Sequence, residues 1–291
     1  MLNRLNVYYN GWGESWLWGT LISSTATTGR PTIAFEYSPE AIQQGVELSS
    51  YLLPLKGLPF RQGFPTHQMG LPGPVYDALP DGWGMMLMDR YFKKIGLNSA
   101  RIGPLERLTY ISSHAMGALS FEPCVADMQT SENIPLPQLA QEVQEVLKGE
   151  GSEFLQHLLV MGDSPQGARP KALVYRDPVN LEFSTQASNQ HEAWLIKFPA
   201  QQEHPEVCAI EAVYAECLRL CAIETPDTHF FNLPNGLTAF ASKRFDRQNG
   251  MRIPMQSLAA YTGADYKVPG SLDYRNFLRA TLMCTQDVRE R

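Results

Sequence analysis

Apolar and polar residues alternate along the first forty positions in the manner of β-strands. Residues 7–9, 16–22 and 32–37 are rich in aromatic and β-branched side chains, and Asn10-Gly11 between the first two runs predicts a hairpin turn. Ser38-Pro39-Glu40 then supplies a capping serine, a proline suited to the first helical position and an acid for the first turn. We therefore expect a small antiparallel sheet followed by a short helix.

Helical periodicity is strongest between residues 81 and 96. Asp81 is predicted to cap this helix and Gly96 to end it, with an apolar stripe made of Trp83, Met86, Leu87, Tyr91 and Ile95. The preceding stretch, 54–74, contains five prolines and four glycines and predicts no regular element. After the helix we expect another helix at 104–113 and a strand at 117–121.

The second half of the chain mixes both periodicities. We expect helices at 137–148 and 152–161, strands at 171–176, 193–198, 228–232 and 237–242, and helices at 205–221, 255–262 and 272–286. The helix at 205–221 should turn its apolar residues inward, namely Val207, Ile210, Val213, Tyr214, Cys217 and Leu218. A polar stretch at 122–135 marks the expected boundary between a domain at 1–125 and a domain at 135–291. The predicted fold class is α+β.

Composition narrows the class of protein. At 291 residues, with 44% hydrophobic and 19% charged residues, the chain can form two globular domains. Its apolar runs are too short for a membrane span, and five cysteines without a C-x-x-C pair are typical of reduced thiols in the cytoplasm. Cys217 and Cys221 are expected to pack in the core rather than to bind a metal. The net charge of −6 argues against general nucleic-acid binding by the chain itself.

A polar loop with small residues, 162–171, leads into the predicted strand at 171–176. Small residues allow a backbone to approach a ligand closely, and amides together with a lysine can hold phosphate oxygens. The loop matches neither G-x-x-x-x-G-K-[ST] nor G-x-G-x-x-G, so by itself it is better explained as a structural turn. Its significance depends on the residues that follow it.

Lys197 lies among apolar residues in the next predicted strand, and Glu211 lies in the helix after that. A strand lysine steadied by a glutamate on the following helix is the arrangement with which protein kinases hold phosphates. The plain alternative for Lys197 is an edge-strand lysine that limits aggregation. Glu211 is the preferred partner because it lies among positions expected to face inward, and Glu216 is the second choice.

Six motifs occur in order along the chain. The first half contains Phe35-Glu36-Tyr37-Ser38-Pro39-Glu40, Leu79-Pro80-Asp81-Gly82-Trp83-Gly84 and Gly117-Ala118-Leu119-Ser120-Phe121. The second half contains Ser164-Pro165-Gln166-Gly167-Ala168-Arg169-Pro170-Lys171, Leu195-Ile196-Lys197-Phe198-Pro199 and Lys243-Arg244-Phe245-Asp246-Arg247. Together they resemble the HipA-like serine/threonine kinases, the toxins of bacterial type II toxin–antitoxin modules. The resemblance implies a small, mostly antiparallel N-terminal subdomain packed on a protein-kinase-like N-lobe, with the start of a helical C-lobe.

The resemblance also implies roles for single residues. Ser164 would be an autophosphorylation site whose added charge displaces the loop from the phosphates of ATP. Lys197 would hold those phosphates, and Glu211 would be its partner on the helix. The other ATP-binding residues implied are Gln166, Gly167, Ala168, Arg169, Pro170 and Lys171 over the phosphates, and Lys243, Arg244 and Phe245 as the hinge that receives adenine.

Phosphoryl transfer also needs a catalytic aspartate and Mg²⁺ ligands. In the family that this chain resembles they come later in the chain, so we expect them beyond Arg291 and expect this kinase to be incomplete. We therefore assign no catalytic base or metal ligand. The acids that remain are better explained as caps, turns or surface residues, namely Asp227, Asp246, Asp265, Asp273 and Asp287.

Two functions stay open at this point. The first is transfer of phosphate from ATP, with Mg²⁺, to a serine or threonine of a protein substrate, for which the resemblance implies an aminoacyl-tRNA synthetase as one candidate. The second is a non-catalytic fragment or pseudokinase that binds an antitoxin or a partner kinase half. The resemblance further implies a HipB-like helix-turn-helix antitoxin as partner, contact with DNA mainly through that antitoxin, and no membrane partner.

Overall fold

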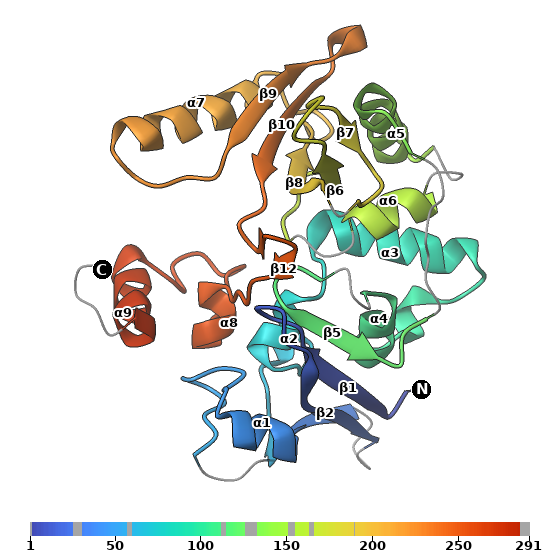
Figure 1. The fold of residues 1–291 in the computed structure, drawn as a ribbon. Coiled ribbons are helices and arrows are strands. Elements are labelled where there is room, and N and C mark those ends of the chain that lie inside the picture. Colours follow the sequence, from blue (N-terminus) through green and yellow to red (C-terminus); the bar gives the residue numbers. More distant parts are fainter. Residues whose placement is uncertain are drawn as a thin grey trace. The chain divides into compact units, whose positions relative to one another are not determined.

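The chain is a mixed α+β protein with antiparallel sheets (Figure 1). The computed structural model describes residues 2–25, 31–56, 60–111, 115–125, 133–150, 155–162, 166–188 and 190–285. These residues form two compact units that interleave along the sequence. The first unit comprises Met1–Leu79, Ala100–Val125 and Arg252–Arg291, and the second comprises Pro80–Ser99 and Ala126–Met251.

The first unit is built on a five-stranded antiparallel sheet with the order β4-β3-β2-β1-β5. Its strands are β1 (Arg4–Tyr9), β2 (Trp16–Thr25), β3 (Pro31–Tyr37), β4 (Phe60–Gln62) and β5 (Leu119–Glu122). The three strands predicted before residue 40 are thus confirmed. The predicted hairpin between the first two strands is also confirmed, but its loop spans residues 10–15, and the positive φ angles lie at Trp12 and Gly13 rather than at Asn10-Gly11.

Helices complete the first unit. They are α1 (Pro39–Gln44), α2 (Gly73–Asp77), α4 (Pro104–Ile111), α8 (Leu258–Thr262) and α9 (Tyr274–Thr285), with 3-10 turns η1 (Thr66–Gln68) and η2 (Ser99–Arg101). Ser38 caps α1 as predicted, since its Oγ accepts a hydrogen bond of 2.9 Å from the Ala41 amide. Because β4, η1 and the start of α2 fall within 54–74, the prediction of no regular element there is wrong.

Long-range polar contacts connect Arg252 and Ser257 to earlier segments of this unit. The Arg252 guanidinium donates to the carbonyls of Ala115, Gly117 and Leu119 at 2.7–3.1 Å. The Asp77 carboxylate accepts from both the amide and the hydroxyl of Ser257, at 2.6 and 2.8 Å. Ser257 is also the N-cap of α8, so Asp77 fixes the start of α8 to the end of α2.

The second unit contains another five-stranded antiparallel sheet, with the order β7-β6-β8-β10-β9. Its strands are β6 (Lys171–Arg176), β7 (Phe183–Ser184), β8 (Glu192–Lys197), β9 (Thr228–Asn232) and β10 (Thr238–Lys243), with η3 (Pro234–Gly236) between the last two. The short strands β11 (Arg247–Gln248) and β12 (Met251–Arg252) follow. The four strands predicted in this region are confirmed, and β8 occupies the middle of the sheet.

In its described residues the second unit has four helices: α3 (Gly82–Lys94), α5 (Leu136–Lys148), α6 (Leu155–Gly162) and α7 (Val207–Leu220). In α3 the fully buried large side chains are Trp83, Leu87, Met88 and Phe92. The predicted stripe is therefore partly wrong, since Met86 and Tyr91 are half-buried and Ile95 is exposed. Gly96 has a φ of 80°, as expected after a helix end.

The predicted inward face of α7 is wrong. Ile210, Val213 and Tyr214 are 51%, 62% and 69% exposed, and only Cys208 and Ala215 are buried along the helix. Cys217 and Cys221 are exposed thiols, so the expectation that they pack in the core is wrong as well. The apolar pattern located the helix correctly, but the residues of α7 that are buried are small ones and not the large apolar ones.

No helix in the described part of the chain is both long and apolar enough to cross a membrane.

Candidate functional site

The predicted site residues gather at one end of the sheet in the second unit. Lys171 is the first residue of β6 and Lys197 is the last residue of β8, and the two are direct cross-strand partners. Lys197 also pairs with Phe240 of β10 on its other side, and its ammonium lies 5.7 Å from the centre of that ring. Because β8 is flanked by strands on both sides, the edge-strand explanation of Lys197 is wrong.

One carboxylate joins two of the cations. Glu211 of α7 accepts from Lys197 Nζ at 2.5 Å with one oxygen and from Arg169 Nη1 at 2.8 Å with the other. Arg169 also contacts Glu203, whose Oε1 lies 2.9 Å from its Nε. The Ala200 amide, and with it Arg169, lowers the pKa of Glu203 below its usual value. Glu216 instead pairs with the exposed Arg219, at 3.2 Å.

Lys171 is buried beneath the loop that precedes it. Only 3% of the residue is exposed, and its Nζ donates to the Gly167 carbonyl at 2.7 Å. Burial lowers the pKa of Lys171 to about 8, and Lys197 adds to the effect while Asp81 opposes it. A lysine with this pKa still carries most of its charge at pH 7, so it can attract an anion.

The start of α3 holds the loop from the other side. The Asp81 carboxylate accepts from the Gly167 amide, and the Trp83 amide donates to the Gly167 carbonyl at 3.3 Å. The Trp83 indole donates to the Lys171 carbonyl at 3.1 Å. The sequence predicted Asp81 as a cap, and it does occupy the N-cap position, but its side chain makes no capping hydrogen bond. The contact with Gly167 was missed because it joins residues 86 positions apart.

The other predicted residues of the loop lie in the same place. Pro170 is buried and its carbonyl accepts from the Phe198 amide at 2.9 Å, while Ala168 is exposed. Gln166 has a buried side-chain nitrogen, Nε2, for which the described residues supply no acceptor. A buried donor of this kind is suited to an oxygen of a bound ligand. Ser164, the predicted autophosphorylation site, lies outside the described residues.

The predicted hinge is held by charge pairs. Lys243 Nζ lies 2.5 Å from Glu192 Oε1, and the Lys243 and Arg244 amides donate to the carbonyls of Asp227 and Ala193. The Arg244 side chain is buried and makes two hydrogen bonds of 2.8 and 2.7 Å to Asp246, which is itself fully buried. Arg244 therefore stabilises the turn with its side chain. Phe245 is 64% exposed and presents its ring to solvent.

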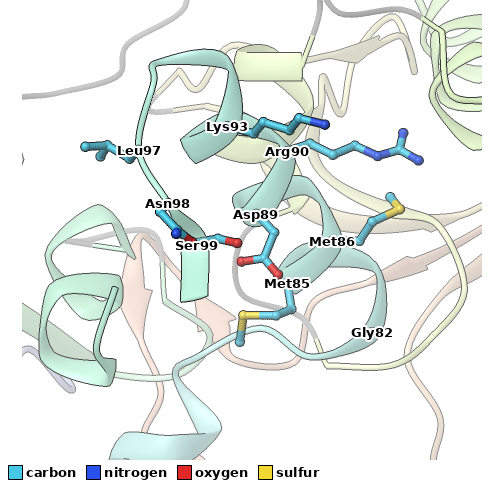
Figure 2. Close-up of a pocket in the computed structure, with 9 residues that line it drawn as sticks. All are labelled: Gly82, Met85, Met86, Asp89, Arg90, Lys93, Leu97, Asn98 and Ser99. Carbon is cyan, nitrogen blue, oxygen red and sulfur yellow. The ribbon is translucent and has the colours of Figure 1, made fainter. Parts of the chain in front are cut away.

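A separate hollow of about 720 Å³ runs along α3 from Gly82 to the segment at 97–99 (Figure 2). Met86 and Arg90 extend on one side of the helix, whereas Asp89 lies on the side of Asn98 and Ser99. It is lined by none of the predicted ATP-binding residues. Among the described residues there is also no group of three or more His, Cys, Asp or Glu side chains that could hold a metal ion.

Comparisons with known proteins agree with this architecture. The HipA N-terminal domain matches residues 13–122, and the HipA-like C-terminal domain matches residues 164–291. Among solved structures, the chain is similar to one of the Shewanella oneidensis MR-1 toxin–antitoxin complex of HipA, HipB and operator DNA, with a TM-score of 0.55 and 16% sequence identity. At that identity the likeness concerns the fold alone. No curated protein matches the chain.

The structural match covers 94% of this chain but only 63% of the other, so this chain spans less than two thirds of the solved relative. The two domain matches lie in the order expected from the sequence motifs and together cover most of the chain. The chain therefore belongs to the HipA family.

Proposed function

We propose that the second unit is the nucleotide-binding part of a HipA-type protein serine/threonine kinase and that it binds ATP. The observation that carries this proposal is the pair formed by Lys197 on the central strand and Glu211 on the next helix, 2.5 Å apart. A five-stranded antiparallel sheet with such a pair is the arrangement of a protein-kinase N-lobe.

The residues present are suited to the phosphates of ATP. Arg169, Lys171 and Lys197 bring three cations to one end of the sheet, and Gln166 adds a buried side-chain donor. Glu211 holds Lys197 and Arg169 in fixed positions, so that neither has to be ordered when a ligand arrives. The exposed ring of Phe245, beside the hinge strand β10, is available to stack on adenine.

Bound ATP, with Mg²⁺, would supply the phosphoryl group that such a kinase transfers to a protein. Here Lys197, Arg169 and the loop 166–171 would orient the phosphates and offset their charge. We assign the roles of catalytic base and Mg²⁺ ligand to no residue of this chain. The protein substrate, for which aminoacyl-tRNA synthetases are candidates, is part of the same proposal.

A HipB-like antitoxin is the partner that we propose. The solved relative is a complex of HipA with HipB and operator DNA. Since this chain carries a net charge of −6, we propose that it reaches DNA mainly through the antitoxin. The exposed apolar face of α7 favours a second candidate function, namely a module that binds another polypeptide without catalysing phosphoryl transfer.

Nucleotide binding can be tested by thermal unfolding with and without Mg·ATP. A ligand present at about ten times its Kd stabilises the folded state by about 1.4 kcal/mol, which raises the Tm by a few degrees. Lys197→Ala should abolish the shift. Lys148→Ala, an exposed lysine at the end of α5, should leave it unchanged. If the wild-type chain shows no shift at millimolar ATP, the proposal fails.

Phosphoryl transfer requires a separate test, because a chain that binds ATP need not be a kinase. The chain is incubated with Mg·ATP and examined by mass spectrometry for phosphate on Ser164, with Lys197→Ala as the control. Phosphate on Ser164 in the wild type alone would support autophosphorylation. Binding of ATP without phosphate on any residue would refute kinase activity of this chain by itself and leave the proposal of nucleotide binding intact.

A further inference from the structure

Asp81 makes an unusual contact for a residue at a helix start. It occupies the N-cap position of α3, where an aspartate ordinarily accepts a hydrogen bond from the second or third amide of its own helix. Its side chain makes no such bond and accepts instead from the amide of Gly167. The carboxylate is therefore directed at the proposed phosphate-binding loop.

Both polar groups of Gly167 are engaged within the chain. Its amide donates to Asp81, and its carbonyl accepts from Lys171 Nζ at 2.7 Å and from the Trp83 amide at 3.3 Å. In this arrangement the Gly167 amide is not available to a phosphate, and the Lys171 ammonium is bonded to the loop's own backbone.

Two glycines make the close approach feasible. A Cβ on Gly82 would lie 2.7 Å from Ala168 Cα, and a Cβ on Gly167 would lie 2.7 Å from Lys171 Nζ. Both glycines also have positive φ angles, 36° and 119°, which side chains other than glycine rarely allow. The contact between the start of α3 and the loop therefore requires glycine both at residue 82 and at residue 167.

Each carboxylate at the site lies near a cation. Glu203 and Glu211 pair with Arg169 and Lys197, whereas the charge of Asp81 acts on Lys171, more strongly than that of Glu211 does. Three carboxylates therefore face three cations. A carboxylate oxygen that accepts from a backbone amide beside an ammonium makes the same contacts as a phosphate oxygen in a phosphate-binding loop.

We propose that the Asp81 carboxylate occupies the place of a nucleotide phosphate oxygen on the Gly167 amide and so competes with ATP for the loop. This inference rests on the proposed function and adds a regulatory contact to the same site. ATP has to displace Asp81 from Gly167 before the loop can bind its phosphates. Since two anions in the same place repel each other, Asp81 lowers the affinity for ATP but not for adenosine, which carries no phosphate.

The test uses Asp81→Asn, which keeps the size of the side chain and removes its charge. Without nucleotide, the Gly167 amide should exchange its hydrogen faster than in the wild type. Isothermal titration should show that the variant binds Mg·ATP about fivefold or more tightly than the wild type, with adenosine binding unchanged. Asp89→Asn removes one negative charge from the same helix at a position that does not contact Gly167, and it should bind ATP like the wild type.

The wild-type chain offers a test without any variant. When Mg·ATP displaces Asp81, the ¹³C resonance of its side-chain carboxyl group should move, because the carboxylate loses an N–H donor. A resonance that stays in place at saturating ATP would overturn the proposal.

The outcomes separate this inference from the proposed function. If the wild type binds ATP, Lys197→Ala does not, and Asp81→Asn binds ATP no more tightly than the wild type, the competition is refuted and nucleotide binding stands. If neither the wild type nor Asp81→Asn binds ATP, the proposed function is refuted, and the competition with it.

Discussion

Glu211 is the residue on which the arrangement of the cations depends. Its two oxygens engage Lys197 and Arg169, and about a quarter of its side chain is exposed. An ion pair at this level of exposure contributes modestly to stability, because water screens the charges. Its main effect is to fix two long side chains in one geometry.

Replacing Glu211 therefore measures the structural part of this arrangement. Glu211→Gln should lower the free energy of unfolding by about 1 kcal/mol, because two cations lose their shared partner. Glu216→Gln, on the same helix, should change it by less than about 0.5 kcal/mol, since Glu216 and its partner are exposed. Urea unfolding of both variants provides the measurement. Equal effects would mean that Glu211 has no special place on α7.

The buried ammonium of Lys171 predicts a dependence of ATP binding on pH. Burial lowers the pKa of Lys171 to about 8, so the charge that attracts phosphate is lost as pH rises through 8. We expect the Kd for ATP to increase between pH 7 and pH 9. Lys171→Met, which cannot ionise, should bind more weakly at pH 7 and show a smaller change. Parallel pH profiles for the two chains, measured by titration calorimetry, would contradict this role.

At the scale of elements, Asp77 links the end of α2 to the start of α8. Burial raises the pKa of Asp77 to about 6, although the amide and hydroxyl of Ser257 act against this. The raised pKa means that the folded state favours the protonated form of Asp77. Asp77 therefore makes its full contribution to the free energy of unfolding below about pH 4, and this contribution is lost as pH rises through 6.

Asp77→Asn tests this dependence, because asparagine does not ionise and can still bond to Ser257. Between pH 4 and pH 6 the wild type should lose stability relative to the variant, by at most about 1.4 kcal/mol per pH unit. Urea unfolding at several pH values measures the difference. Glu224→Gln, which alters an exposed carboxyl group, should follow the wild type. A constant difference between wild type and Asp77→Asn would show that Asp77 ionises as freely in the folded chain as in the unfolded one.

Elements could be located from the sequence more reliably than their faces. The strands β6 and β9 coincide with the predicted ranges, because alternation along a strand is a local property. Which side of α7 meets the sheet is not local, and there the prediction was wrong. The same holds for the site. The pair of Lys197 and Glu211 could be predicted from the order of the strand and the helix that carry them. The cross-strand pairing of Lys171 with Lys197 and the contact of Asp81 with Gly167 depend on tertiary structure and could not be predicted.

At the scale of the whole chain, each of the two compact units is made of segments that are separated in the sequence. The proposed domains, 1–125 and 135–291, follow the order of the sequence, whereas α3 lies in the second unit and α8 and α9 lie in the first. Contacts between residues that are distant in the sequence hold these segments together, such as the hydrogen bond between Asp77 and Ser257 in the first unit. A polar stretch in the sequence marks where a chain can leave a domain, but it does not show where the chain returns.

The elements of the chain also differ in how much apolar surface they bury. In α9, Ala280 is the only buried residue, while Tyr274 is 86% exposed and Phe277 is 50% exposed. In contrast, β8 has Trp194 and Ile196 almost completely buried and is hydrogen-bonded to strands on both sides. Local opening is easier where fewer apolar side chains lose contacts on opening.

Hydrogen exchange of the isolated chain should therefore be uneven. The amides of 274–285 should exchange at least tenfold faster than those of β8, because opening α9 exposes little apolar surface that is not already exposed. Exchange followed by mass spectrometry on a sample shown to be monomeric provides the measurement. Slow exchange of α9 in the monomer would contradict this account, since the packing that the structure shows could not protect it. If α9 becomes protected only when a second polypeptide is added, its exposed side chains belong to a binding surface.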